Sequence, residues 1–111
     1  MAATPEWIDG HLLELLGRSP GRSRLAAELG AGLGLGRPEL DASLERLSAR
    51  RRVLVVDHPP PDRHLARADL RVVSELPEGL PREEAEARAV AAAAAVWEAW
   101  LRQFLAVHRC G

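Results

Sequence analysis

The clearest hydrophobic pattern of the chain is a helical period that passes directly into a run of strand-forming residues. Leu40, Leu44 and Leu47 recur at i, i+4 and i+7, which places them on one face of a helix. The next apolar residues, Val53–Val56, form a short run rich in β-branched side chains, which is typical of a strand. The pattern therefore predicts a helix over Arg37–Arg51, followed at once by a strand.

Weaker patterns before and after this stretch predict three more elements. We expect a first helix over Pro5–Leu16, where Thr4 and Pro5 suit the capping and first helical positions. A second, short helix is predicted over Arg24–Leu29, and the glycines of Gly30–Gly36 indicate a flexible turn. A second strand over Asp69–Ser74 completes a hairpin with the first, and a proline-rich loop joins the two strands.

The C-terminal part of the chain predicts one long helix over Arg82–His108, after a connector at 77–81. Its alanines favour helix strongly, and acidic residues gather at its beginning. Large apolar residues recur along it every seven residues. Such a face must be buried against something, and we expect it to form a dimer interface. The alternative is that it packs on the same chain or on another protein. The predicted interface residues are Val90, Ala93, Trp97, Trp100, Leu101, Phe104 and Val107.

Composition narrows the class of protein. The chain has 111 residues and a formal net charge of −1, so its overall field does not attract nucleic acid or an anionic membrane. It contains no lysine, and its single cysteine, Cys110, excludes an internal disulfide. We find no signal sequence, and the longest apolar run, Ala89–Trp97, is too short to span a bilayer. These features predict an intracellular, cytoplasmic protein, or a nuclear one if the source is eukaryotic.

The order of the predicted elements, together with LAAELG at 25–30 and LERLSARR at 44–51 leading into VLV at 53–55, resembles the winged-helix superfamily. Small bacterial transcriptional regulators in particular look similar. The resemblance implies an α+β, mostly helical fold with three helices, a β-hairpin wing and a long C-terminal helix. It implies a winged-helix domain at 1–76, the connector at 77–81, and a dimerisation element at 82–111.

The resemblance also implies a function, which is binding of double-stranded DNA by a homodimeric transcriptional regulator. Arg37–Arg51 is then the recognition helix, which enters the major groove. Its exposed residues should be Arg37, Glu39, Asp41, Ala42, Ser43, Glu45 and Arg46. The predicted DNA contacts are Arg37, Ser43, Arg46, Arg50, Arg51, Arg52, Arg63 and Arg67.

Three acidic residues of the same helix, Glu39, Asp41 and Glu45, suit a phosphate-rich groove badly. The alternative is therefore a winged-helix module that binds another protein within a larger complex and does not read DNA. A continuous positive surface around the arginines favours DNA, and an interrupted one favours a protein partner.

Catalytic and metal-binding chemistry has little support in the sequence. His58 and His64 share a proline-rich loop with two aspartates, but such a loop is a poor cage for a metal. No nucleophile, base and orienting group can be assigned. We therefore expect no enzyme activity, no metal and no cofactor.

Overall fold

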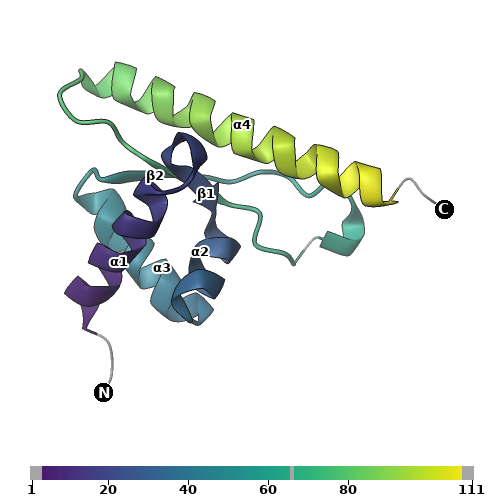
Figure 1. Ribbon diagram of the computed structural model, residues 1–111, viewed down its shortest axis with the longest axis horizontal. Helices are drawn as coiled ribbons and strands as arrows, with labels where there is room; N and C mark the ends of the chain where they lie inside the picture. Colours follow the sequence, from purple (N-terminus) through teal and green to yellow (C-terminus); the bar gives the residue numbers. More distant parts are fainter. Residues whose placement is uncertain (1–3, 66, 109–111) are drawn as a thin grey trace.

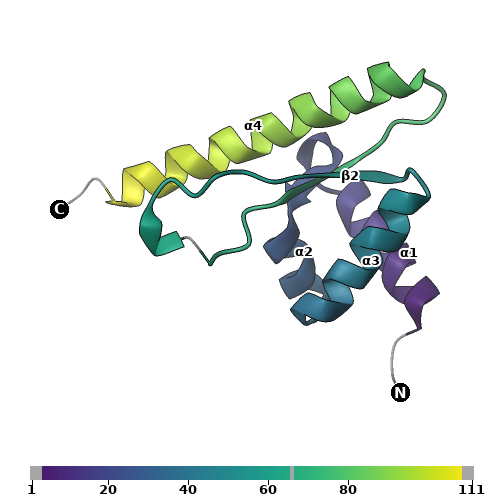
Figure 2. The same ribbon diagram turned by 180° about the vertical axis from the view of Figure 1, so that it is seen from behind.

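The computed structural model describes residues 4–65 and 67–108, and arranges them in three layers (Figures 1 and 2). Three helices form one layer, a small antiparallel sheet forms the middle layer, and one long helix covers the other face of the sheet. The architecture is therefore α+β and mostly helical, as the sequence predicts.

The three-helix layer consists of α1 (Pro5–Gly17), α2 (Ala26–Leu33) and α3 (Arg37–Ala49). Thr4 caps α1, because its Oγ1 accepts a hydrogen bond from the backbone N–H of Trp7 at 3.2 Å. The predicted leucine stripe of α3 is buried and faces the other helices and the sheet. The core of this layer consists of Leu12, Leu16, Ala26, Leu29, Leu40, Leu44, Leu47, Val53 and Val73.

The sheet has the strand order β1-β3-β2, formed by β1 (Ser23–Leu25), β2 (Val53–Val56) and β3 (Val72–Glu75). Neighbouring side chains of the central strand, β3, point to opposite faces of the sheet. Helices cover both faces, so the side chains on each face are buried. Val73 packs into the core of the three-helix layer, while Val72 packs beneath the long helix. The sheet thus joins two separate apolar clusters.

The long helix, α4 (Arg82–His108), lies along the outer face of the sheet (Figure 1). Its first half approaches the sheet through small side chains, and Ala85, Ala89 and Ala93 are all buried. Two residues of the predicted dimer interface, Val90 and Val107, are 48% and 72% exposed, so they do not pack on the sheet. The alanine row faces the sheet instead, because only small residues allow the helix to approach it closely.

The remaining differences from the predicted elements concern the N-terminal half. The sequence prediction missed β1 and placed helix Arg24–Leu29 partly over it. The predicted flexible turn over Gly30–Gly36 is also wrong in its first half, since α2 continues to Leu33 and Gly30 is buried. Gly34 ends this helix with a left-handed φ of 66°, which glycine adopts without strain.

Short 3-10 turns lie before β1, at Pro20–Arg22, and in the β2–β3 loop, at Arg63–Leu65. The second strand of the hairpin is shorter than predicted, because Asp69 and Arg71 are held in an ion-paired bend before it.

Candidate functional site

The N-terminal end of α3 carries a network of ion pairs that includes a predicted DNA contact, Arg37. Its guanidinium lies 3.2 Å from Asp41 and 3.8 Å from Asp69. Arg71 joins the same two carboxylates, with nitrogen–oxygen distances of 2.7 Å to each. Hydrogen bonds from Arg71 hold the pKa of Asp69 below its ordinary value, although partial burial opposes this shift. The two arginines and two aspartates therefore neutralise one another where α3 meets the segment before β3.

A second ion-paired group connects the middle of α3 to α1. The buried carboxylate of Asp9 accepts hydrogen bonds from the Ser43 hydroxyl at 2.5 Å and from Arg46 at 2.8 and 3.0 Å. Burial opposes ionisation of Asp9, but the hydrogen bonds from Arg46 and Ser43 and the charges of Arg46 and Arg50 outweigh it. The pKa of Asp9 is therefore lowered. The carboxylate is charged at neutral pH and fully engaged inside the protein.

This group corrects two predictions for α3. Ser43 is not an exposed DNA contact, since it has no exposed surface and donates its hydroxyl to Asp9. Arg46 retains 32% of its side-chain exposure but directs its guanidinium at α1. The remaining exposed positions of α3 include Glu39 and Glu45. Its outward face is thus more acidic than the count of arginines in the sequence indicates.

Sequence reasoning missed Asp9, although the signal was present. Asp9, Leu12 and Leu16 lie at i, i+3 and i+7, so the carboxylate occupies the buried face of α1. A charged residue on such a face needs a buried partner. The position alone did not reveal which of the fifteen arginines supplies it.

The other predicted DNA contacts lie in two separate places. Arg50, Arg51 and Arg52 follow the end of α3 and precede β2, and Arg51 is paired with Glu86 of α4 at 3.4 Å. Arg63 and Arg67 belong to the β2–β3 loop, at the opposite end of β2 (Figure 2). Within residues 4–65 and 67–108, Arg50, Arg52, Arg63 and Arg67 form no ion pair, although the charge of Arg50 acts on Asp9 from a longer distance. The predicted contacts therefore form two groups and not one continuous positive surface.

The C-terminal half of α4 carries a row of stacked rings. His58 of the β2–β3 loop stacks on Trp97 at a centroid distance of 4.5 Å, and Trp97 stacks on Trp100 at 5.0 Å. Phe104 continues the row at 5.3 Å from Trp100. Both tryptophans also pack against the cluster of Leu25, Val72 and Ala93. Much of the surface of these tryptophans is therefore used within the chain.

This packing changes the predicted dimer interface. Ala93 has no exposed surface, so it cannot lie at an interface between two chains. Val90, Leu101 and Leu105 are separated by eleven and four residues, so they lie on one flank of α4. Val90 and Leu105 are exposed, and Leu101 is half-buried. Val107 is also exposed, but it follows Trp100 by seven residues and lies on the Trp100 side of the helix.

The length and apolar composition of α4 also meet the requirements for a membrane-spanning helix over Arg82–Val107, contrary to the prediction from the shorter alanine-rich run. A single helix of this kind is weak support for a membrane protein, and the inner face of α4 packs on the sheet.

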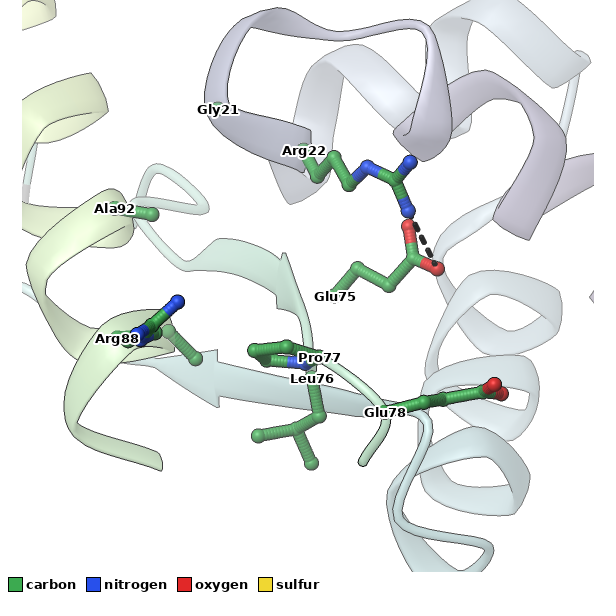
Figure 3. Close-up of a pocket in the computed structure, with 9 residues that line it drawn as sticks. Gly21, Arg22, Glu75, Leu76, Pro77, Glu78, Arg88 and Ala92 are labelled. Carbon is green, nitrogen blue, oxygen red and sulfur yellow. Dashed lines mark ion pairs between the residues drawn. The ribbon is translucent and has the colours of Figure 1, made fainter. Parts of the chain in front are cut away.

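Hollows border α4 in several places, and two of them lie near β1. One, of about 420 Å³, lies between the start of α4, the turn before β1 and the end of β3 (Figure 3). Arg22 and Glu75 point toward each other at its edge and form an ion pair at 3.6 Å. The other, of about 470 Å³, is a groove between β1 and α4, whose lining includes three alanines and Trp100 of α4 and the Arg24–Glu28 pair. Neither lining contains a cysteine or histidine, and neither brings together a nucleophile and a base.

Metal-binding groups are also scattered. In the part of the chain that the structure describes, no three side chains of His, Cys, Asp or Glu gather around a possible metal position. His58 stacks on a tryptophan, and His64 lies beside Asp62 at 3.9 Å in the exposed loop. Cys110 lies outside the described residues.

Comparisons with models of protein families, with curated proteins and with solved structures gave no match for this chain.

Proposed function

We propose that this chain is a winged-helix module that binds another protein, with the exposed apolar flank of α4 as its docking surface. The observation that carries the proposal is the internal use of the α3 arginines. Arg37 is shared between Asp41 and Asp69, and Arg46 is held by Asp9. A helix that reads DNA needs such side chains free to reach base edges and phosphates.

The order of elements supports the winged-helix part of the proposal. Three helices precede a hairpin, a short β1 adds to its second strand, and the helix before the hairpin is α3. In that superfamily the corresponding helix is the one that enters a DNA groove. Here Glu39 and Glu45 remain on its outward side, and a carboxylate facing phosphates is repelled by them.

The flank of α4 supports the protein-binding part. Val90 and Leu105 are exposed on one flank of α4, and half-buried Leu101 lies between them on the same flank. Exposed apolar side chains grouped in this way are typical of interaction surfaces. An amphipathic helix of the partner suits such a flank, because helices pack by fitting ridges of apolar side chains together.

Binding of duplex DNA without sequence selection is the second candidate. It is favoured by one observation, which is that Arg50 and Arg52 at the end of α3 form no ion pair among the described residues. Arg63 and Arg67, in the loop, share this property. Phosphate contacts from these arginines give affinity but carry no sequence information.

Fluorescence anisotropy with labelled duplexes at low salt tests the two candidates. The protein-binding proposal predicts no sequence-selective binding by the wild type. It predicts none by the Glu39→Gln, Asp41→Asn, Glu45→Gln triple variant either, because Asp9 still holds Arg46 and Asp69 still lies beside Arg37. Binding that prefers one duplex sequence, and that Arg37→Ala or Arg46→Ala alters, would overturn the proposal.

Non-specific DNA binding, the second candidate, predicts a different outcome of the same experiment. If the wild type binds all duplexes alike, replacing Arg50, Arg51 and Arg52 by glutamine should weaken that binding and flatten its dependence on salt. Arg88→Gln is the matched control, because Arg88 lies on α4 and is paired with Glu84. This outcome would replace the α4 docking function by non-specific DNA association.

A further inference from the structure

The sheet has an open edge at β2. In the order β1-β3-β2, this strand is hydrogen-bonded to β3 on one side only. Its four residues, Val53–Val56, are all apolar, and Leu54, Val55 and Val56 are only half-buried. Edge strands of natural proteins usually carry a charge, a proline or a bulge that prevents pairing with other chains. None of these interrupts β2.

The backbone pattern identifies which groups face the open edge. Leu76 donates its N–H to the carbonyl oxygen of Arg52 at 2.9 Å, so Arg52 belongs to the bonded side of the ladder. In an antiparallel pair the bonded residues alternate, and the register pairs Leu54 with Ser74 and Val56 with Val72. The N–H and C=O groups of Val53 and Val55 therefore point away from β3.

A hollow of about 260 Å³ lies beside this edge. It is lined by Val53, Leu54 and Val55 of β2, by Ser48 and Arg51 at the end of α3, and by residues of α4 and the segment after β3. The three β2 residues Val53, Leu54 and Val55 therefore border an open hollow.

The residues that flank β2 have opposite charges. Arg51 and Arg52 precede the strand, and Asp57 follows it. Asp57 has no ion-pair partner among the described residues, and Arg51 makes only the exposed contact with Glu86. When two copies of this segment run antiparallel with Leu54 opposite its own counterpart, the hydrogen-bonding residues Val53 and Val55 face each other. Asp57 of each copy then lies beyond Val53 of the other, next to the turn at Arg51 and Arg52, where the left-handed φ of Arg51, 59°, ends the extended segment.

We propose that β2 pairs with β2 of a second copy of this chain, which forms a continuous six-stranded antiparallel sheet across a twofold axis. The segment is self-complementary in hydrogen-bonding groups, in apolar side chains and in charge, which an isologous interface requires. This self-association uses a different surface from the docking flank of α4, so the two proposals can fail separately.

Sedimentation over a range of protein concentrations tests this pairing. The wild type should dimerise reversibly, and Val55→Pro should shift the protein to monomer. Proline suits this position because the N–H that it removes faces the open edge and takes no part in the β2–β3 ladder. Circular dichroism should confirm that the helical content is retained.

A charge exchange provides an independent readout that remains informative if the proline variant fails to fold. Asp57→Arg and Arg51→Asp should each weaken dimerisation, by about twofold to thirtyfold for two charge pairs between the copies. The double variant should restore it. Arg50→Asp is the matched control, since Arg50 is an exposed arginine outside the strand, and it should not restore association to Asp57→Arg.

Three results would overturn the proposal. The wild type could be monomeric at every concentration. A dimer could persist unchanged in Val55→Pro and Asp57→Arg. Alternatively, Leu101→Glu with Leu105→Glu could abolish dimerisation while the β2 variants do not, which would assign self-association to α4.

Discussion

Helices α3 and α4 lie on opposite faces of the same sheet and use their side chains in opposite ways. The arginines at the beginning and middle of α3, Arg37 and Arg46, are directed at carboxylates of the same chain. The second half of α4 leaves apolar side chains such as Leu105 and Val107 exposed. The helix that the sequence identifies as a DNA reader is thus the more self-contained of the two.

The difference teaches that counting charges along a helix does not give the surface that it presents. Arg37–Ala49 contains two arginines. Asp41 of the same helix is one of their partners, but the other two, Asp9 on α1 and Asp69 before β3, come from other elements. Asp9 and Asp69 are distant in the sequence from the arginines that they hold. Conversely, α4 uses its small residues to pack on the sheet and retains several large ones for its flank.

The largest expected effect concerns the inner face of α3. Leu44 is 3% exposed within the core of the three-helix layer, so Leu44→Ala should lower the free energy of unfolding by about 2–5 kcal/mol. Urea denaturation measures this change. An unchanged midpoint would mean that the leucine stripe does not face the core.

The next largest effect concerns the connection between α1 and α3. Asp9→Ala removes the acceptor for both Ser43 and Arg46, and it should lower the free energy of unfolding by about 2–3 kcal/mol. Glu14→Ala, which removes an exposed pair with Arg18 on the same helix, is the control and should change stability by less than about 1 kcal/mol. Equal losses for the two variants would show that the internal pair behaves as a surface pair.

Acid should weaken the same connection. The folded-state pKa of Asp9 lies below its ordinary value, so the resulting stabilisation is complete above the unfolded pKa of about 3.9. It is lost as the pH falls through the folded pKa. The stability difference between wild type and Asp9→Asn, measured by thermal melting, should therefore shrink as the pH falls from about 6 toward 2. A difference that stays constant over this range would contradict the assigned ionisation of Asp9.

The smallest expected effect on stability concerns the flank of α4. Leu105 is 44% exposed, so Leu105→Ala should change the free energy of unfolding by about 0.5 kcal/mol or less. Trp100→Ala, by contrast, removes a ring that packs on the cluster of Leu25, Val72 and Ala93 and stacks between Trp97 and Phe104. Similar losses for both substitutions, measured by chemical denaturation, would show that the flank is part of the core.

The helices and strands were predicted correctly where the local sequence pattern was strong. The leucine period of α3, the VLVV strand and the boundaries of α4 were all predicted, because periodicity and helix propensity act over short distances. Strand β1 was missed since its three residues pair with β3, which is far away in the sequence. The alanine row of α4 was also missed, because an apolar stripe is usually assigned to the largest side chains.

The candidate site was harder to predict than the fold. The sequence identified the arginines that could contact DNA. Whether each arginine is available to bind DNA depends on its carboxylate partners, several of which only the tertiary structure brings near. Only for Asp9 did the local sequence indicate an internal ion pair, because this carboxylate lies on the apolar face of α1. The open edge of β2 was equally invisible, because strand order is not a property of the strand itself.

The most direct test of the account is an NMR measurement of the Nε–H group of Arg46. If this group donates to Asp9 as described, at 3.0 Å, its proton should exchange slowly with water. Its resonance should also be unaffected when duplex DNA is added at low salt. Fast exchange, or a resonance that shifts as DNA is added, would show that Arg46 is free to bind DNA and would contradict the account.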